Sequence, residues 1–130
     1  MLIADDHRIN QLLATMQLEE LGCHVDTAGD GKDVLNLIAR KDFDIILMDC
    51  QMPELDGYET TRIIRARQRN NLRTPIIAVT ADAMTLGAER YHELGFAGLV
   101  TKPVQVQTLV NAMMAAVANP DEEPLSQDAV

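Results

Sequence analysis

The 130-residue sequence has few cysteines, no long apolar run and no excess of positive charge. Its two cysteines, Cys23 and Cys50, have neither a CxxC spacing nor companion histidines, which argues against a zinc site or a disulfide framework. We expect both to be reduced, buried, small side chains. No apolar run approaches the ~20 residues that span a bilayer, and no signal peptide is recognisable. We therefore expect a soluble, cytoplasmic domain that makes no membrane contact itself.

The charge of the chain is negative but concentrated in few places. The net charge is −9, and the last part of the chain, residues 119–130, carries four acids and no base. Outside that part and the candidate site below, the charges nearly balance, so we expect no direct nucleic-acid binding. The basic cluster of Arg62, Arg65, Arg67, Arg69 and Arg73 is interpreted as the solvated face of a helix and its following loop.

The length fits one domain, which we place at residues 1–118. Residues 119–130 are acidic and contain prolines, which is typical of a disordered tail or linker.

Short apolar runs alternate with segments of helical periodicity along the domain. Strands are predicted at 1–4, 24–27, 43–49, 75–80 and 98–101. Helices are predicted at 8–21, from Gly31 onwards, from an Asp56 N-cap with Glu59 three residues later to about Gln68, at 82–94, and around 106–117. The inward positions of the 82–94 helix are small, so we expect it to be weakly packed. Alternating units of this kind predict an α/β fold: a doubly wound five-stranded parallel sheet with five helices.

Polar side chains end four of the predicted strands. Asp5 and Asp6 follow the first, Asp49 ends the third, Thr80 ends the fourth and Lys102 follows the fifth. Taken alone, Asp49 reads more readily as a loop cap. Together, three carboxylates at one sheet edge favour a hard divalent cation such as Mg²⁺. With that cation, a lysine ammonium and a threonine hydroxyl, phosphoryl transfer onto Asp49 becomes chemically sensible.

This ordered set of motifs resembles the receiver domain of two-component response regulators. The motifs are Asp5-Asp6, the stretch from Met48 to Pro53 with Asp56-Gly57 following, Val79-Thr80-Ala81, and Lys102-Pro103. The resemblance implies a flavodoxin-like sheet of order 2-1-3-4-5. It also implies that Asp6, Asp49 and the backbone carbonyl of Gln51 ligate Mg²⁺ while Asp5 acts through water, and that the Lys102–Pro103 bond is cis.

The resemblance carries further expectations about partners and output. Asp49 would take its phosphoryl group from the phosphohistidine of a histidine kinase or histidine phosphotransfer domain, and the domain would catalyse its own phosphorylation and dephosphorylation. The stretch from Asp5 to Asn10 and that from Met48 to Arg65 look most like receivers of hybrid sensor kinases or phosphorelays. The chain would then be the cytoplasmic part of a membrane-anchored protein, with a possible phosphorylation-dependent dimer.

One position departs from the family pattern. Receivers usually carry an aromatic residue or histidine three residues before the lysine, and this chain has Leu99. The usual switch, in which that side chain moves with Thr80, is therefore in doubt. By resemblance, the output surface would be the helix from Asp82, the strand before Lys102 and the final helix.

Two other readings stay open on the sequence alone. The chain could be a receiver-like binding module that is not phosphorylated. It could instead be an aspartyl-phosphate hydrolase, although such enzymes commonly have a second Asp where this chain has Gln51. Catalytic roles are not expected for His7, His24 or His92.

Overall fold

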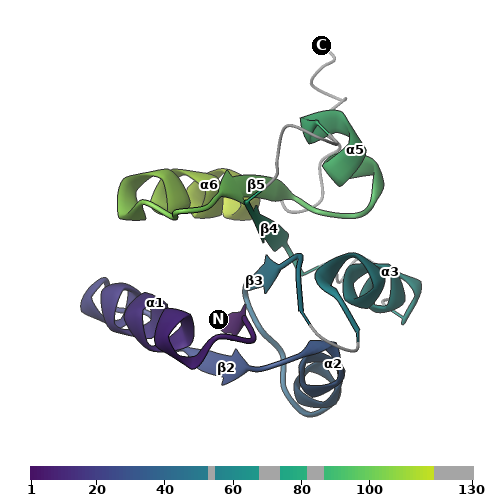
Figure 1. Ribbon diagram of the computed structural model, residues 1–130, viewed down its shortest axis with the longest axis horizontal. Helices are drawn as coiled ribbons and strands as arrows, with labels where there is room; N and C mark the ends of the chain where they lie inside the picture. Colours follow the sequence, from purple (N-terminus) through teal and green to yellow (C-terminus); the bar gives the residue numbers. More distant parts are fainter. Residues whose placement is uncertain (53–54, 68–73, 82–86, 119–130) are drawn as a thin grey trace.

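A computed structural model describes residues 1–52, 55–67, 74–81 and 87–118. Within these ranges, strands and helices alternate along the chain (Figure 1). The strands are β1 (Leu2–Ala4), β2 (Asp26–Ala28), β3 (Ile46–Asp49), β4 (Ile76–Thr80) and β5 (Gly98–Thr101). The helices are α1 (Arg8–Glu20), α2 (Gly31–Arg40), α3 (Gly57–Arg67), α5 (Ala88–Glu93) and α6 (Val106–Ala118).

The strands form one parallel sheet in the order β2-β1-β3-β4-β5. Every residue of β1, β3 and β4 is buried, which explains why these strands appear in the sequence as continuous apolar runs. The doubly wound α/β fold, its strand order and its helices are therefore confirmed within the described residues.

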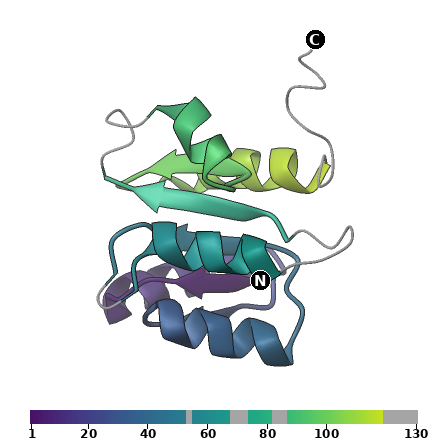
Figure 2. The same ribbon diagram turned by 90° about the vertical axis from the view of Figure 1, so that its right-hand side faces the viewer.

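Helices cover both faces of the sheet (Figures 1 and 2). On one face, Val34 of α2, Ile64 of α3 and Tyr91 of α5 pack in a common core with the strands. We call this the α2/α3/α5 face. On the other, Leu18 of α1 packs with Leu109 of α6, and we call this the α1/α6 face. No helix in the described ranges is long and apolar enough to cross a membrane.

Aspartate caps set the start of two helices. The Asp30 side chain accepts a hydrogen bond from the Asp33 backbone N–H (2.9 Å), and Asp56 accepts one from Glu59 (2.9 Å). The predicted Asp56 cap is therefore confirmed. Glu59 does not complete a capping box, because its carboxylate pairs with Arg62 on the exposed side of α3.

Some predicted boundaries were wrong by a few residues. β2 begins at Asp26, which pairs with Leu2, the first residue of the three-residue strand β1. His24 therefore lies outside the strand, and it is exposed. In the predicted helix 82–94, the described helix covers Ala88–Glu93 and is anchored by Tyr91, which is 1% exposed. Residues 82–86, the predicted end of α3 at Gln68 and the tail 119–130 lie outside the described residues.

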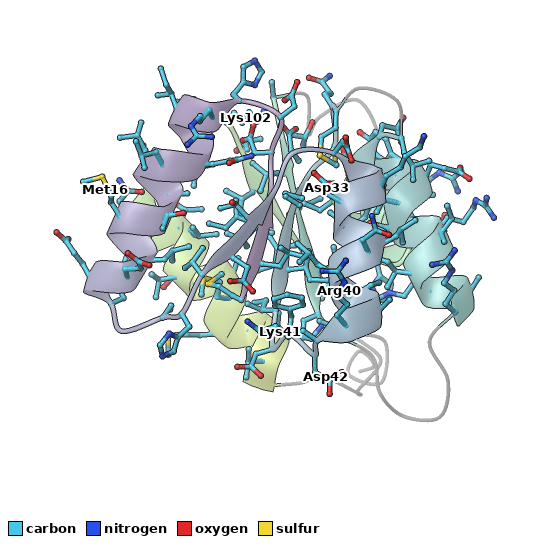
Figure 3. The ribbon with its side chains drawn as sticks, turned by 90° about the horizontal axis from the view of Figure 1, so that it is seen from below. Met16, Asp33, Arg40, Lys41, Asp42 and Lys102 are labelled. Carbon is cyan, nitrogen blue, oxygen red and sulfur yellow. The ribbon has the colours of Figure 1, made fainter. Side chains whose placement is uncertain are left out.

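The packing of helix α1 differs most from what its sequence pattern suggests. Its apolar spacing predicts the helix correctly, but Ile9, Leu12, Leu13 and Met16 are 54–70% exposed. Within α1, Leu18 is the buried residue. Figure 3 shows Met16 pointing away from the sheet. The apolar side of α1 is therefore a surface of the molecule.

The two cysteines differ in burial. Both are free thiols; Cys50 is buried as predicted, whereas Cys23 is only half-buried at the end of α1, where it packs against the α1/α6 core.

Candidate functional site

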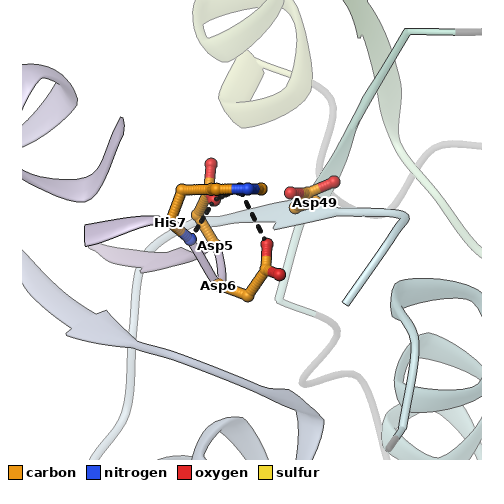
Figure 4. A group of neighbouring side chains, drawn as sticks. All are labelled: Asp5, Asp6, His7 and Asp49. Carbon is orange, nitrogen blue, oxygen red and sulfur yellow. Dashed lines mark hydrogen bonds and ion pairs between the residues drawn. The ribbon is translucent and has the colours of Figure 1, made fainter. Parts of the chain in front are cut away.

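The predicted carboxylates meet at the carboxyl edge of the sheet (Figure 4). Asp5 and Asp6 follow β1, and Asp49 ends the adjacent strand β3. Ligand atoms of Asp5, Asp6, His7 and Asp49 all lie within 4.8 Å of one another. Because parallel strands end at one edge, residues more than forty positions apart in the chain form a single acidic cluster.

Lys102 is paired with Asp49. Its Nζ donates a hydrogen bond to Asp49 Oδ2 at 3.1 Å, and the Asp49 side chain is only 2% exposed. The Lys102–Pro103 peptide bond is cis, as predicted. The Lys102 backbone N–H also donates to the Thr80 carbonyl (2.8 Å), so the lysine is held at the end of β4 as well.

Burial raises the pKa of the Asp49 carboxyl. The Gln51 backbone N–H, which donates to Asp49 Oδ1 at 3.0 Å, and the Lys102 ammonium both oppose this change in pKa. Desolvation is the larger effect, so the ionised carboxylate is poorly stabilised by the protein alone. A further cation at this edge would lower that cost.

Two residues without a predicted role help to hold the acidic cluster. The His7 backbone N–H donates to Asp5 Oδ1 (2.8 Å), and His7 Nδ1 lies 3.0 Å from Asp6 Oδ1. The Gln11 side-chain amide donates to the Asp5 carbonyl (2.6 Å) and to the Ala28 carbonyl (3.3 Å). Gln11 thus ties α1 to the ends of β1 and β2. No local sequence signal marks a glutamine for such a contact.

The donor set fits a hard divalent cation. Asp5, Asp6 and Asp49 offer carboxylate oxygens, the ligands that Mg²⁺ prefers, and their charges need neutralisation. Gln51 lies just beyond β3 and is exposed. The ligand role of its backbone carbonyl stays a prediction, as does the water-mediated role of Asp5.

Thr80 and Leu99 lie on adjacent strands. Thr80 is buried at the end of β4, and Leu99 of β5 is half-buried and pairs in register with Ala78. Leu99 packs against the core of the α2/α3/α5 face. The position that is usually aromatic therefore holds an aliphatic side chain facing the helix α5 layer.

The structure explains why the motif after Asp49 has a glycine at position 57. A Cβ atom at this position would lie 2.4 Å from the Asp49 carbonyl oxygen, much closer than van der Waals contact. The start of α3 can therefore approach the end of β3 only because residue 57 has no side chain.

The arginine cluster is not a uniform solvated face. Arg62 and Arg67 are exposed, but Arg65 is half-buried. Its Nε donates to the Gly95 carbonyl (2.9 Å), and its Nη1 donates to the Thr74 carbonyl (2.8 Å). For Arg65 the prediction was wrong, because the guanidinium binds backbone carbonyls that are distant in sequence. Arg69 and Arg73 lie outside the described residues.

A cavity of about 290 Å³ lies beside the acidic cluster, on the α1/α6 face. Asp5, Asp49 and Lys102 line it at the sheet edge. Much of the remaining lining is apolar and comes from the strands and both helices: Ile3, Leu13, Ala14, Leu47, Val79 and Leu109. Asn10 and Gln17 of α1 also line it. The site is therefore continuous with a mainly apolar cavity on the α1/α6 face.

Comparison with known proteins agrees with this architecture. A family model described as the response regulator receiver domain matches residues 1–114. The chain is 40% identical over 108 residues to the sensor histidine kinase RcsC of Salmonella typhimurium. The match covers 83% of this chain and 11% of the kinase, so the chain spans about a tenth of that relative's length.

Solved structures share the fold. The receiver domain of the sensor histidine kinase PA1611 from Pseudomonas aeruginosa PAO1 matches with a TM-score of 0.80 at 36% identity, covering 90% of this chain and 95% of that one. That structure has a magnesium ion coordinated in its active site cleft. The receiver domain of Ssk1 from Saccharomyces cerevisiae, solved with the histidine phosphotransfer protein Ypd1, matches with a TM-score of 0.80 at 23% identity, covering 93% and 90% of the two chains.

Proposed function

This chain belongs to the response regulator receiver domain family, and from that premise we propose that it accepts a phosphoryl group on Asp49 from a partner's phosphohistidine. The main support is the buried Asp49 carboxylate, 3.1 Å from the Lys102 ammonium and within 4.8 Å of the Asp5 and Asp6 ligand atoms. Phosphoryl transfer depends on positioning and on neutralised charge more than on covalent help. The arrangement provides the positioning, and Lys102 together with a bound divalent cation would provide the neutralised charge.

The chain's own side chains have defined tasks in the transfer. A carboxylate oxygen of Asp49 forms the new O–P bond while the N–P bond of the phosphohistidine breaks. The electron pair of the N–P bond stays with the imidazole nitrogen. Lys102 offers positive charge to a phosphoryl oxygen, and the Thr80 hydroxyl donates a hydrogen bond to another. Mg²⁺ bound by Asp6, Asp49 and the Gln51 carbonyl, with Asp5 acting through water, would neutralise phosphoryl charge.

The exposed apolar side of α1 supports a protein phosphodonor with an apolar surface as the partner. It begins just after His7 and carries Ile9, Leu12 and Met16 to the surface. Leu13, from the same helix, lines the cavity that also reaches Asp49 and Lys102. An apolar surface continuous with a reactive site is suited to a protein that presents its phosphohistidine beside apolar side chains. A histidine kinase or a histidine phosphotransfer domain has that chemistry.

The likeness to RcsC and to the PA1611 receiver supports a place within, or alongside, a hybrid sensor kinase. In that setting the domain would lie on the cytoplasmic side of the membrane. Self-catalysed dephosphorylation, a phosphorylation-dependent dimer and the lack of direct nucleic-acid contact remain predictions of this proposal.

Phosphotransfer from isolated donors tests the proposal. With Mg²⁺ present, ³²P-labelled phosphotransfer domains and histidine kinases should pass label to this chain within minutes for at least one donor. The Asp49→Asn variant should take no label, because an amide cannot form the acyl phosphate. Partner binding without any transfer would support the unphosphorylated binding module instead. Repeated turnover of small phosphomonoesters would support the hydrolase.

A further inference from the structure

Aromatic side chains gather in the core of the α2/α3/α5 face, although residue 99 is not aromatic. The chain has two tyrosines and two phenylalanines. Tyr58 of α3, Tyr91 of α5 and Phe96 before β5 lie with ring centroids 5.8–6.3 Å apart. Leu99 packs against the same core. Three of the four aromatic residues thus join α3 to the α5 region, and none occupies position 99.

A hydrogen bond joins the two tyrosine hydroxyls. The Tyr58 and Tyr91 oxygens are 3.0 Å apart, and Tyr91 is 1% exposed. Burial and the hydrogen bond to Tyr91 raise the pKa of Tyr58, so the Tyr58 phenol stays neutral at physiological pH. Since little water reaches Tyr91, separation of the pair would leave a buried hydroxyl without this partner, which is unfavourable. The two side chains are therefore expected to move together.

Tyr58 is linked to the phosphoacceptor through its neighbours Gly57 and Cys50. The Gly57 backbone lies against the Asp49 carbonyl, and the Gly57 N–H donates to the Cys50 carbonyl (3.2 Å). Burial raises the pKa of the Cys50 thiol to about 12, while its interaction with the Tyr58 hydroxyl lowers it somewhat. Gly57, which precedes Tyr58, and Cys50, which follows Asp49, thus connect Tyr58 to the end of β3. A displacement at the end of β3 would therefore reach Tyr58 through these two residues.

The other end of the pair reaches the rest of the α5 region. The Tyr91 carbonyl accepts a hydrogen bond from the Phe96 N–H (3.1 Å), at the turn that leads into β5. Arg65, near the end of α3, donates to the Gly95 carbonyl (2.9 Å) in the same turn. Helix α3 is therefore tied to the α5 region at two points.

We propose that the Tyr58–Tyr91 hydroxyl pair transmits the state of Asp49 to α5, in place of an aromatic side chain at position 99. This inference rests on the proposed function. Modification of Asp49 changes the end of β3, Gly57 and Tyr58 shift with it, and the hydrogen bond between the two hydroxyls carries Tyr91 and α5 along. Tyr58 and Tyr91 are positioning residues that leave the phosphoryl chemistry to Asp49, Thr80 and Lys102.

The test uses the full chain loaded with Mg²⁺ and beryllofluoride, a mimic of the phosphoryl group. Backbone amide NMR shifts of Glu89–Glu93 report on α5, and ¹⁹F NMR reports on loading at Asp49. The variants Tyr58→Phe and Tyr91→Phe remove one hydroxyl each and keep the packing. The control is Leu99→Ala, which alters the usual switch position and removes neither hydroxyl.

We expect both phenylalanine variants to load with beryllofluoride like the wild type but to lose more than half of the α5 response. One hydrogen bond supports an about threefold to tenfold change in the ratio of active to inactive conformations. The double variant should resemble either single one, because all three lack the same bond. Leu99→Ala should keep its α5 response.

Two results would overturn the inference while leaving the proposed function intact: a full α5 response in the phenylalanine variants, or its loss in Leu99→Ala. A wild-type chain that does not load with beryllofluoride at saturating Mg²⁺ would instead contradict the proposed function itself, and the inference with it.

Discussion

The two faces of the sheet are packed differently. On the α2/α3/α5 face, a Cβ atom on Gly31 would lie 2.1 Å from Thr60 Oγ1, and Arg65 and the tyrosine pair tie α3 to the α5 region. On the α1/α6 face, a cavity of about 290 Å³ remains and α1 exposes most of its apolar side chains. The close-packed face suits transmission of a change within the domain, and the open face suits recognition of another protein.

The largest effect is expected from adding one methyl group to the close-packed face. Gly31→Ala should lower the free energy of unfolding by ~3 kcal/mol, because backbone and side-chain atoms of α3 and its preceding loop occupy the space. The matched control is Gly22→Ala at the end of α1, where nothing lies within 4 Å and only the positive φ of 93° opposes the change. Gly22→Ala should lower the free energy of unfolding by ~1 kcal/mol. If urea denaturation shows that both variants lose the same free energy of unfolding, the close packing around Gly31 is contradicted.

The second largest change in the free energy of unfolding is expected at Asp49, on the sheet edge between the two faces. In the absence of metal, Asp49→Asn should raise the free energy of unfolding by about 2 kcal/mol near neutral pH, because the buried carboxylate no longer has to be ionised. The pKa of Asp49 is raised in the folded protein, so the wild type regains this stability as the pH falls. Near the ordinary value of 3.8 the unfolded chain also binds the proton, and the gain should vanish.

Denaturation of both proteins across this pH range in EDTA measures that effect. A gain that is independent of pH would show that the amide stabilises the fold for another reason.

A smaller effect is expected from filling the open face. Ala14→Leu adds apolar atoms at the cavity wall and should raise the free energy of unfolding by ~1 kcal/mol. Ala28→Leu, the same substitution in the close-packed core, should lower it, because Ala28 is only 3% exposed among large neighbours. Thermal unfolding of the pair gives the comparison. Destabilisation by both variants would mean that the cavity is not available to a side chain.

The smallest effect on stability, with a large effect on partner recognition, is expected on α1. The double variant Leu12→Ser/Met16→Ser changes exposed side chains, so its free energy of unfolding should stay within ~0.5 kcal/mol of the wild type. Phosphotransfer from a protein donor should slow by about tenfold, because the apolar contact is lost. Phosphorylation by acetyl phosphate should not change. If the protein donor reacts at the wild-type rate, α1 is not the contact surface.

The sequence predicts the site better than it predicts these packing differences. Asp49 and Lys102 are identifiable because each interrupts or follows a buried apolar strand, and parallel strands end at the same edge. The spacing of Leu12 and Met16 shows that α1 has an apolar side, but periodicity does not say whether the protein covers it. The Tyr58–Tyr91 contact joins residues 33 positions apart, and Arg65 reaches a carbonyl 30 positions away. Such contacts depend on tertiary packing that local patterns do not encode.

The central claim is that Asp49 becomes an acyl phosphate, and borohydride trapping tests it most directly. The chain is incubated with Mg²⁺ and a phosphohistidine donor, reduced with sodium borohydride and mapped by peptide mass spectrometry. The account predicts conversion of Asp49 to homoserine, with Asp5 and Asp6 unchanged and no conversion in EDTA. Reduction at another carboxylate, or no reduction after the donor has lost its phosphoryl group to this chain, would contradict it.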